Sequence, residues 1–182
     1  MKIVVTGSNG LLGQTLVNLL KKQPEKYQVF GLSRGANRSH RNDFVYHNID
    51  ITQKGLLTAC LQEIQPDCIV NTAAMTNVDA CEENKQICWD LNVTFPNILA
   101  QFCTQYDIKI IIVTRDPRDI FIDFPHKRYL PSELNLLEKS KCFVKFFLSM
   151  RDELEEIKKL DNILFIKFED LILNHEFTKD KI

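Results

Sequence analysis

The chain has 182 residues, 45% hydrophobic and 26% charged, and is therefore long enough to bury one sizeable core. A formal net charge of −1 argues against a large nucleic-acid-binding surface, because such domains carry a clear basic excess. No apolar run reaches the roughly 18 residues that a membrane-spanning helix needs, and Gly7 interrupts the only run that could belong to a signal peptide. Six scattered cysteines without a C-x-x-C pair predict reduced, mostly buried thiols in a cytoplasmic protein, and no metal site is expected.

The amino-terminal part alternates strand and helix signals with short connections, which is typical of parallel βαβ units. A buried-strand run at residues 2–6 is followed by a glycine-rich turn and then by a helix over residues 11–22. Further strands are predicted over residues 27–32, 44–46, 68–71 and 108–113, and further helices over residues 53–65 and 88–106.

The character of the chain changes after the fifth strand. Residues 115–141 are charged and punctuated by three prolines, and they are followed by a predicted helix over residues 142–160 and a sixth strand over residues 162–168. A last helix is expected to begin at residues 169–174. The pattern predicts a single α/β domain with a doubly wound, parallel, Rossmann-type sheet in three α/β/α layers and the strand order 3-2-1-4-5-6. We expect the part of this domain after the fifth strand to be less regular than the rest.

The turn after the first strand has the spacing G-x-x-G-x-x-G. A dinucleotide-binding turn needs glycine for the tight bend, for backbone approach to a pyrophosphate and for close helix–strand packing. The start of the following helix adds a partial positive charge that attracts phosphate. We therefore predict a nucleotide-binding site, against the alternative of an ordinary glycine turn, and its residues are Gly7, Ser8, Asn9, Gly10, Leu11, Leu12 and Gly13.

The end of the second strand distinguishes NAD from NADP. NAD sites place an acidic residue there for the ribose hydroxyls, whereas an arginine accommodates a 2′-phosphate. Here the strand ends in Ser33-Arg34 without an acidic residue, which favours NADP. The alternative is that Arg34 is a solvated cation of the loop.

Several motifs in residues 1–110 together resemble the dTDP-4-dehydrorhamnose reductases, extended short-chain dehydrogenase/reductases that act on a nucleotide sugar. The matching segments are Val5–Gly13, Asp50-Ile51, Asn71–Glu82 and Leu91-Asn92-Val93. The resemblance implies that Asp50 and Ile51 flank the adenine. It also implies that Ala73, Ala74 and Thr76 line the ribose and nicotinamide side, with Asn92 beneath the site.

The same resemblance leaves the catalytic residues unassigned. The family has a Tyr-x-x-x-Lys pair after the fifth strand, in which the tyrosine hydroxyl exchanges a proton with the sugar carbonyl oxygen. In this chain Thr114 could serve as the hydroxyl member of the set, but the later tyrosine, Tyr129, is followed four residues on by Glu133. The sequence therefore predicts an incomplete catalytic set.

Residues 109–182 resemble a fragment of a second family, the PAPS-dependent sulfotransferases. The resemblance rests on Ile111–Phe121, which contains Arg115-Asp116-Pro117-Arg118, and on Ile163–Leu171. It implies that Arg115, together with Arg118, binds the 3′-phosphate of PAPS, because a guanidinium suits a phosphate dianion. A salt-bridged loop is the equally weighted alternative. Asp123 stands where the sulfotransferases have a serine. The loop with which those enzymes hold the 5′-phosphosulfate has no counterpart in this chain.

The two resemblances meet within the fifth strand. We therefore expect an NAD(P)-binding domain over residues 1–113 and a sulfotransferase-like segment over residues 114–182 that completes the same sheet. The leading hypothesis is an NAD(P)-binding protein of the reductase type, with a nucleotide sugar as its other partner and with impaired chemistry. A non-enzymatic nucleotide-binding subunit and a sulfotransferase-like fusion are the alternatives.

Overall fold

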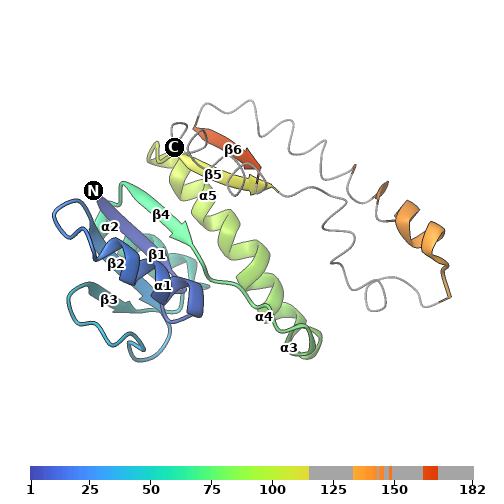
Figure 1. The fold of residues 1–182 in the computed structure, drawn as a ribbon, viewed down its shortest axis with the longest axis horizontal. Coiled ribbons are helices and arrows are strands. Elements are labelled where there is room, and N and C mark those ends of the chain that lie inside the picture. The colour runs from blue at the N-terminus through green and yellow to red at the C-terminus, as the bar shows by residue number, and fades with distance from the viewer. Residues whose placement is uncertain (115–132, 143, 146–147, 149–161, 168–182) are drawn as a thin grey trace. The chain divides into compact units, whose positions relative to one another are not determined.

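A computed structural model describes the chain except for residues 115–132, 143, 146–147, 149–161 and 168–182 (Figure 1). The chain divides into two compact units, Met1–Ile108 and Lys109–Ile182. The predicted helix from residues 169–174 and most of the predicted helix over residues 142–160 lie outside the described residues.

The first unit is built on a four-stranded parallel sheet. Its strands are β1 (Lys2–Thr6), β2 (Gln28–Ser33), β3 (Val45–Asn48) and β4 (Cys68–Asn71), in the order β3-β2-β1-β4. Val4 in the central strand lies opposite Phe30 of β2 on one side and Ile69 of β4 on the other. The predicted Rossmann-type sheet, with the order 3-2-1-4 for its first four strands, is therefore confirmed.

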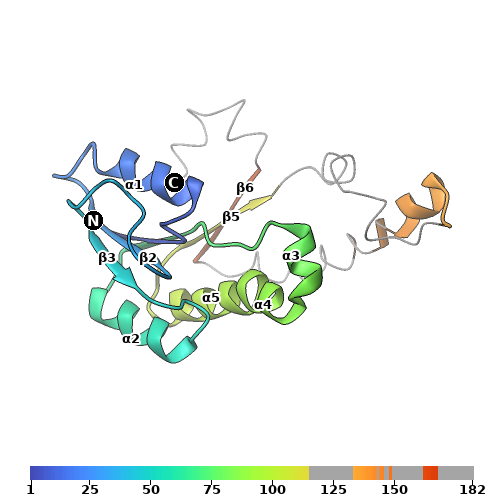
Figure 2. The same ribbon diagram turned by 90° about the horizontal axis from the view of Figure 1, so that it is seen from below.

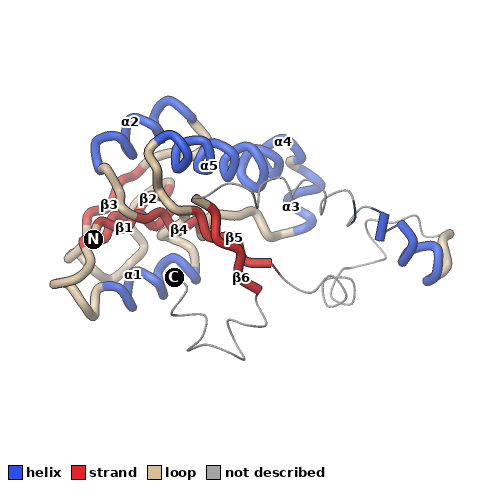
Figure 3. Tube along the Cα trace, turned by 90° about the horizontal axis from the view of Figure 1, so that it is seen from above, coloured by secondary structure: helices blue, strands red, loops and turns tan. Residues whose placement is uncertain are grey.

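Helices cover both faces of this sheet. Figure 3 shows α1 on one face and α2 and α5 on the other. The helices of this unit are α1 (Leu11–Leu20), α2 (Lys54–Ile64), α3 (Val78–Glu83), α4 (Lys85–Trp89) and α5 (Phe95–Gln105), with a π-helical turn, η1 (Asp90–Thr94), joining the last two. The same arrangement is seen from below in Figure 2.

The hydrophobic core follows from the strand pattern. Val4 and Val5 of β1 are fully buried, because a central parallel strand is covered on both faces. Val17 of α1 packs with Ile3, Val5 and Val29 on one side of the sheet. Leu57, Leu61 and Phe95 are also fully buried, and they lie on helices α2 and α5.

The second unit contains a separate two-stranded parallel sheet. Its strands are β5 (Ile110–Thr114) and β6 (Ile163–Lys167), with Ile112 opposite Phe165. The sequence predicted one sheet of six strands, whereas the hydrogen-bonded ladders of the described residues form one sheet of four strands and one of two. Residues 136–142 are helical, so helix in this unit begins before the predicted residue 142.

The predicted helix over residues 88–106 is confirmed in outline, because helical residues run without a break from 85 to 105 through α4, η1 and α5. The sequence predicted neither the π-helical turn nor the short helix α3 that precedes α4. The Asn77 side chain accepts a hydrogen bond from the Ala80 N–H and so starts α3, and Asn84 (φ −129°, ψ 60°) ends it. Asparagine at a helix start satisfies an N–H group that has no partner within the helix.

Two cysteines also differ from their prediction. Cys81 and Cys88 form a disulfide between α3 and α4, with their Cα atoms 5.2 Å apart, so the prediction of reduced thiols is wrong for this pair. Cys103 is buried, Cys60 and Cys68 are half-buried, and Cys142 is exposed. Among the residues that the structure describes, no helix is long and apolar enough to cross a membrane.

Candidate functional site

The candidate site lies at the carboxyl ends of β1, β2 and β4. β2 pairs with one side of β1 and β4 with the other, so the chain connections reverse direction at β1. In open parallel sheets, ligands bind beside such a reversal, in the crevice outside the carboxyl ends of the strands. The loops after β1, β2 and β4, which carry most of the residues predicted from the sequence, all belong to the first unit.

The glycine turn lets two segments approach the end of β1 closely. Gly7 has φ +71°, and a Cβ atom there would lie 2.7 Å from the backbone nitrogen of Ala73. A Cβ atom on Gly13 would collide with the carbonyl oxygen of Gly7 and lie 2.8 Å from the Cα of Ser8. Gly7 therefore admits the segment after β4, and Gly13 admits α1, as the spacing of the motif requires.

The start of α1 is arranged for an anion. Gly10 is the residue that precedes the helix; it has no side chain to cap the first N–H groups, and the first turn contains no acidic residue. The side chains of Leu11 and Leu12 are 89% and 65% exposed. N–H groups that lack a partner at a helix start, together with the helix dipole, favour phosphate at this position.

Ser8 fills the space beneath the turn. The residue is 2% exposed, and its hydroxyl oxygen has no hydrogen-bond partner among the described residues. A Cβ atom on Gly31 of β2 would lie 2.8 Å from that oxygen. The absence of a side chain at Gly31 thus makes room for Ser8.

The end of β2 joins the glycine turn through Asn9. The hydroxyl oxygen of Ser33 accepts a hydrogen bond from the Asn9 backbone N–H at 3.1 Å, and Ser33 is buried. The Asn9 side chain also contacts the loop after β2, where its Oδ1 accepts from the Arg38 N–H at 2.9 Å. The sequence identified Asn9 only through the glycine motif, because the partners of its side chain are more than 20 residues away.

Asp50 and Arg34 lie close together at the same edge. Asp50 Oδ1 accepts hydrogen bonds from the Thr52 N–H at 3.0 Å and from the Thr52 hydroxyl at 2.6 Å. The Thr52 hydroxyl is the main cause of the lowered pKa of Asp50, and the nearby Arg34 lowers it further. Arg34 Nη1 is 3.9 Å from Asp50 Oδ2. Ile51 is 6% exposed and packs into the core.

The loop after β4 is held by two asparagines. Asn71 Oδ1 accepts hydrogen bonds from the Thr6 hydroxyl at 2.8 Å and from the Ala73 N–H at 2.9 Å. Asn92 in η1 holds Met75 on both sides: its Oδ1 accepts from the Met75 N–H at 2.8 Å, and its Nδ2 donates to the Met75 carbonyl at 2.9 Å. These contacts fix the segment that contains Ala73, Ala74 and Thr76. The position of Asn71 at a strand end was the signal from which its role could have been predicted.

The remaining candidates come from the part of the chain after β5. Arg115, Arg118 and Tyr129 lie outside the described residues, so their predicted roles stay predictions. In the described part of the chain, no group of three His, Cys, Asp or Glu side chains could hold a metal ion.

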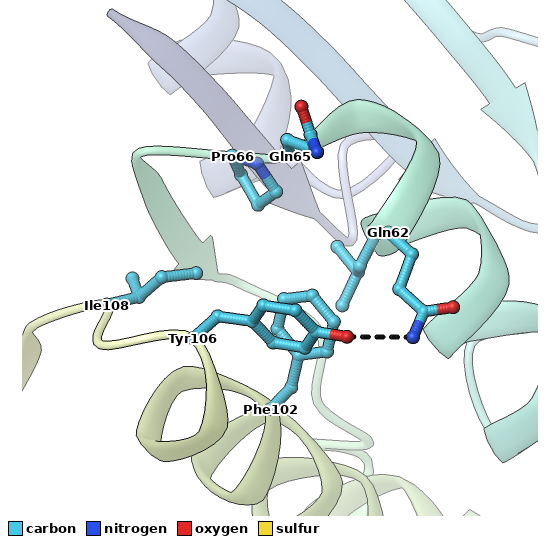
Figure 4. A pocket seen from close by; sticks show the side chains of 7 residues that line it. Gln62, Gln65, Pro66, Phe102, Tyr106 and Ile108 are labelled. Atoms are coloured by element: carbon cyan, nitrogen blue, oxygen red, sulfur yellow. Dashed lines mark hydrogen bonds between the residues drawn. The ribbon is translucent and has the colours of Figure 1, made fainter.

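A separate hollow of about 400 Å³ lies beside the C-terminal ends of α2 and α5 (Figure 4). Gln62 Nε2 donates to the Tyr106 hydroxyl at 2.8 Å across it, and the rings of Phe102 and Tyr106 are 4.4 Å apart. Pro66 in its wall lies two residues before the amino end of β4. The hollow is therefore distinct from the site at the carboxyl ends of the strands, and none of the predicted site residues lines it.

Comparisons with known proteins agree with this geometry. The model of the family described as "RmlD substrate binding domain" matches residues 1–117. The probable low-salt glycan biosynthesis reductase Agl14 of Haloferax volcanii is 34% identical over 116 residues, which are 64% of this chain and 37% of that protein. A dTDP-4-dehydrorhamnose reductase of Aggregatibacter actinomycetemcomitans is 27% identical over 63% of this chain and 35% of its own length. The chain thus spans about a third of the relatives it matches.

Solved structures extend the likeness. A structure described as a hypothetical dTDP-4-dehydrorhamnose reductase from Sulfolobus tokodaii superposes with a TM-score of 0.57 at 25% identity, covering 92% of this chain and 55% of its own. The UDP-glucose 4-epimerase of Thermus thermophilus, solved with NAD, has a TM-score of 0.54 at 21% identity over 64% of this chain and 37% of its own, which shows a shared fold. The Sulfolobus likeness runs past residue 117, and the predicted sulfotransferase segment finds no support in these comparisons.

Proposed function

Because the chain belongs to the RmlD substrate-binding-domain family, we propose that it binds NADP(H) as the coenzyme-binding part of a reductase for a nucleotide-linked 4-keto sugar. The observation that carries the proposal is the uncapped start of α1, which Gly7 and Gly13 hold against β1 and the loop after β4. The substrate class follows from the reductases among its relatives.

The residues at the edge fit the parts of a dinucleotide. The N–H groups at the start of α1 would hold the diphosphate, because they lack a capping side chain. Ser33, at the end of β2, would lie beside the adenosine ribose, and Asp50 at the adenine end. Ala73, Ala74 and Thr76, on the loop fixed by Asn71 and Asn92, would face the nicotinamide half.

The bound coenzyme supplies a hydride, and a nearby group must exchange a proton with the sugar oxygen. Within this chain the Tyr-x-x-x-Lys pair is missing, and Tyr129 is followed by Glu133 at the fourth position. Loss of a positioned proton donor lowers rates by about 10²- to 10⁴-fold. We therefore expect this chain alone to bind coenzyme but to reduce a 4-keto sugar slowly or not at all.

Two measurements on the full chain test the proposal. Titration with NADPH, followed by its fluorescence, should show saturable binding. Incubation of the complex with a dTDP-linked 4-keto-6-deoxysugar should then oxidise NADPH at a rate close to the background. Failure to bind NADPH or NADH would refute the proposal. Tight binding with rapid turnover would uphold the site and refute the inference of an incomplete catalytic set.

Sulfate transfer is a weaker alternative. Its candidate residues, Arg115 and Arg118, lie outside the described residues, and the comparisons do not support the resemblance on which it rests. The same titration with 3′,5′-adenosine bisphosphate distinguishes the two functions, because only a sulfotransferase-type site should bind that compound more tightly than NADPH.

A further inference from the structure

Two of the three arginines in the loop after β2, Arg34 and Arg38, differ in their surroundings. Arg34, which the sequence singles out, faces the Asp50 carboxylate at 3.9 Å. That carboxylate is held by Thr52 and kept ionised, so a phosphate placed beside Arg34 would also meet a negative charge. The Arg38 guanidinium, by contrast, forms no hydrogen bond or ion pair with any residue that the structure describes.

The backbone of this loop is fixed to the glycine turn by one side chain. Asn9 Nδ2 donates to the carbonyl oxygens of Arg34 at 3.1 Å and Ala36 at 3.0 Å, while Asn9 Oδ1 accepts from the Arg38 N–H at 2.9 Å. Asn9 itself sits between Gly7 and Gly10, beside the expected diphosphate. The loop is therefore folded back over the nucleotide-binding turn, and Arg38 starts from a backbone position next to it.

β3 holds the same loop from its other side. The Tyr46 hydroxyl donates to the Gly35 carbonyl at 2.7 Å and lies 2.9 Å from Asn9 Nδ2. Asn48 Oδ1 accepts from the Gly35 N–H at 2.8 Å, where Gly35 has φ +80°. Neutral side chains thus hold the backbone of the loop at Gly35, and among the described residues no carboxylate pairs with the Arg38 guanidinium.

We propose that Arg38, rather than Arg34, is the residue that selects NADP(H) over NAD(H), by binding the 2′-phosphate, and that Asn9 and Tyr46 position it. This inference rests on the proposed coenzyme site and adds the residue that distinguishes NADP(H) from NAD(H). A guanidinium without a partner can bind a phosphate through two parallel hydrogen bonds, whereas the Arg34 guanidinium would first have to break its ion pair with Asp50.

The test compares single variants of the full chain by calorimetric titration with NADPH, NADH and 2′,5′-ADP. Arg38→Ala should weaken NADPH and 2′,5′-ADP by about 10- to 100-fold, the usual range for a lost charge-assisted hydrogen bond, and should leave NADH within about twofold. Arg34→Ala should weaken NADPH by less than Arg38→Ala does. Arg41→Ala is the matched control, because Arg41 Nε already donates a hydrogen bond to Asp43 Oδ1 at 2.8 Å.

Tyr46→Phe tests the positioning role. It removes the hydroxyl and keeps the ring, which meets Phe44 edge-on with ring centroids 6.5 Å apart. The ratio of NADPH to NADH affinity should fall while NADH binding is kept, a change that a general loss of stability would not produce. A larger effect from Arg34→Ala than from Arg38→Ala, or no effect of Arg38→Ala on NADPH, would overturn this inference alone. Failure of the unmodified chain to bind either coenzyme would overturn the proposed function as well.

Discussion

Gly7→Ala tests whether the glycine turn is required by geometry. At φ +71° an alanine costs about 1–2 kcal/mol relative to glycine, because its Cβ crowds the following carbonyl. The new Cβ would also lie 2.7 Å from Ala73 N and 2.8 Å from Ala73 Cα, and both are backbone atoms that cannot rotate away. Overpacking of this kind costs about 1–3 kcal/mol. We therefore expect unfolding to become easier by about 2–5 kcal/mol in total.

Urea denaturation followed by circular dichroism measures this change, with Gly55→Ala as the control. Gly55 is an exposed residue of α2, and a Cβ there meets no atom within 4 Å. Alanine in a helix is favoured over glycine by about 0.5–1 kcal/mol, so the control should be stabilised. The Gly7 variant should also lose NADPH affinity, because the segment after β4 must move. Equal stability of Gly7→Ala and the unmodified chain would refute the reasoning.

Two further predictions concern the cysteines. Burial raises the pKa of Cys103 from 9.0 to about 11, so the unfolded chain loses this proton first and the stability due to Cys103 should decline as pH rises from 9 to 11. Urea midpoints across that range should fall less in Cys103→Ala, and identical slopes would contradict the assignment. Reduction of the Cys81–Cys88 disulfide by dithiothreitol should add 2 Da by mass spectrometry, as a dithiol requires, and lower stability by about 2–3 kcal/mol, the loop-entropy value for so short a loop. A Cys81→Ser/Cys88→Ser double variant should not respond to the reductant, and an unchanged midpoint in the unmodified chain would count against a structural role.

The fold of the first unit could be predicted from local patterns because each signal is complete within a few residues. β1 is a run of β-branched residues that must be covered on both faces, and Val4 and Val5 are indeed fully buried. The glycine spacing marks the turn and the start of α1 together, since the close approaches at Gly7 and Gly13 leave no room for a side chain at either position. These are the places where sequence and structure agree best.

The disulfide could not be predicted from the spacing of its cysteines. Seven residues on one continuous helix rise about 10 Å, which is beyond the reach of a disulfide. Cys81 and Cys88 approach to 5.2 Å because the chain leaves helical geometry at Asn84, between α3 and α4. The helical periodicity of the sequence does not reveal a break of this kind.

The difference between Arg34 and Arg38 also required the structure. The rule for the end of β2 points to Arg34 by position alone. What sets the two arginines apart is their partners: Asp50 lies 16 residues from Arg34 in sequence, and Asn9 lies 29 residues from Arg38. Such pairs meet only when β1, β2 and β3 are aligned in the sheet.

Four asparagines hold the two loops at this edge without adding negative charge. Asn9 and Asn48 hold the loop after β2, while Asn71 and Asn92 hold the loop after β4, and each uses its amide to bond backbone groups. An amide can both donate and accept, so it satisfies N–H and carbonyl groups alike, whereas a carboxylate can only accept and brings a negative charge. Aspartate at these positions would repel the diphosphate that the start of α1 attracts. The choice of asparagine therefore links the stability of the loops to the charge that the ligand requires.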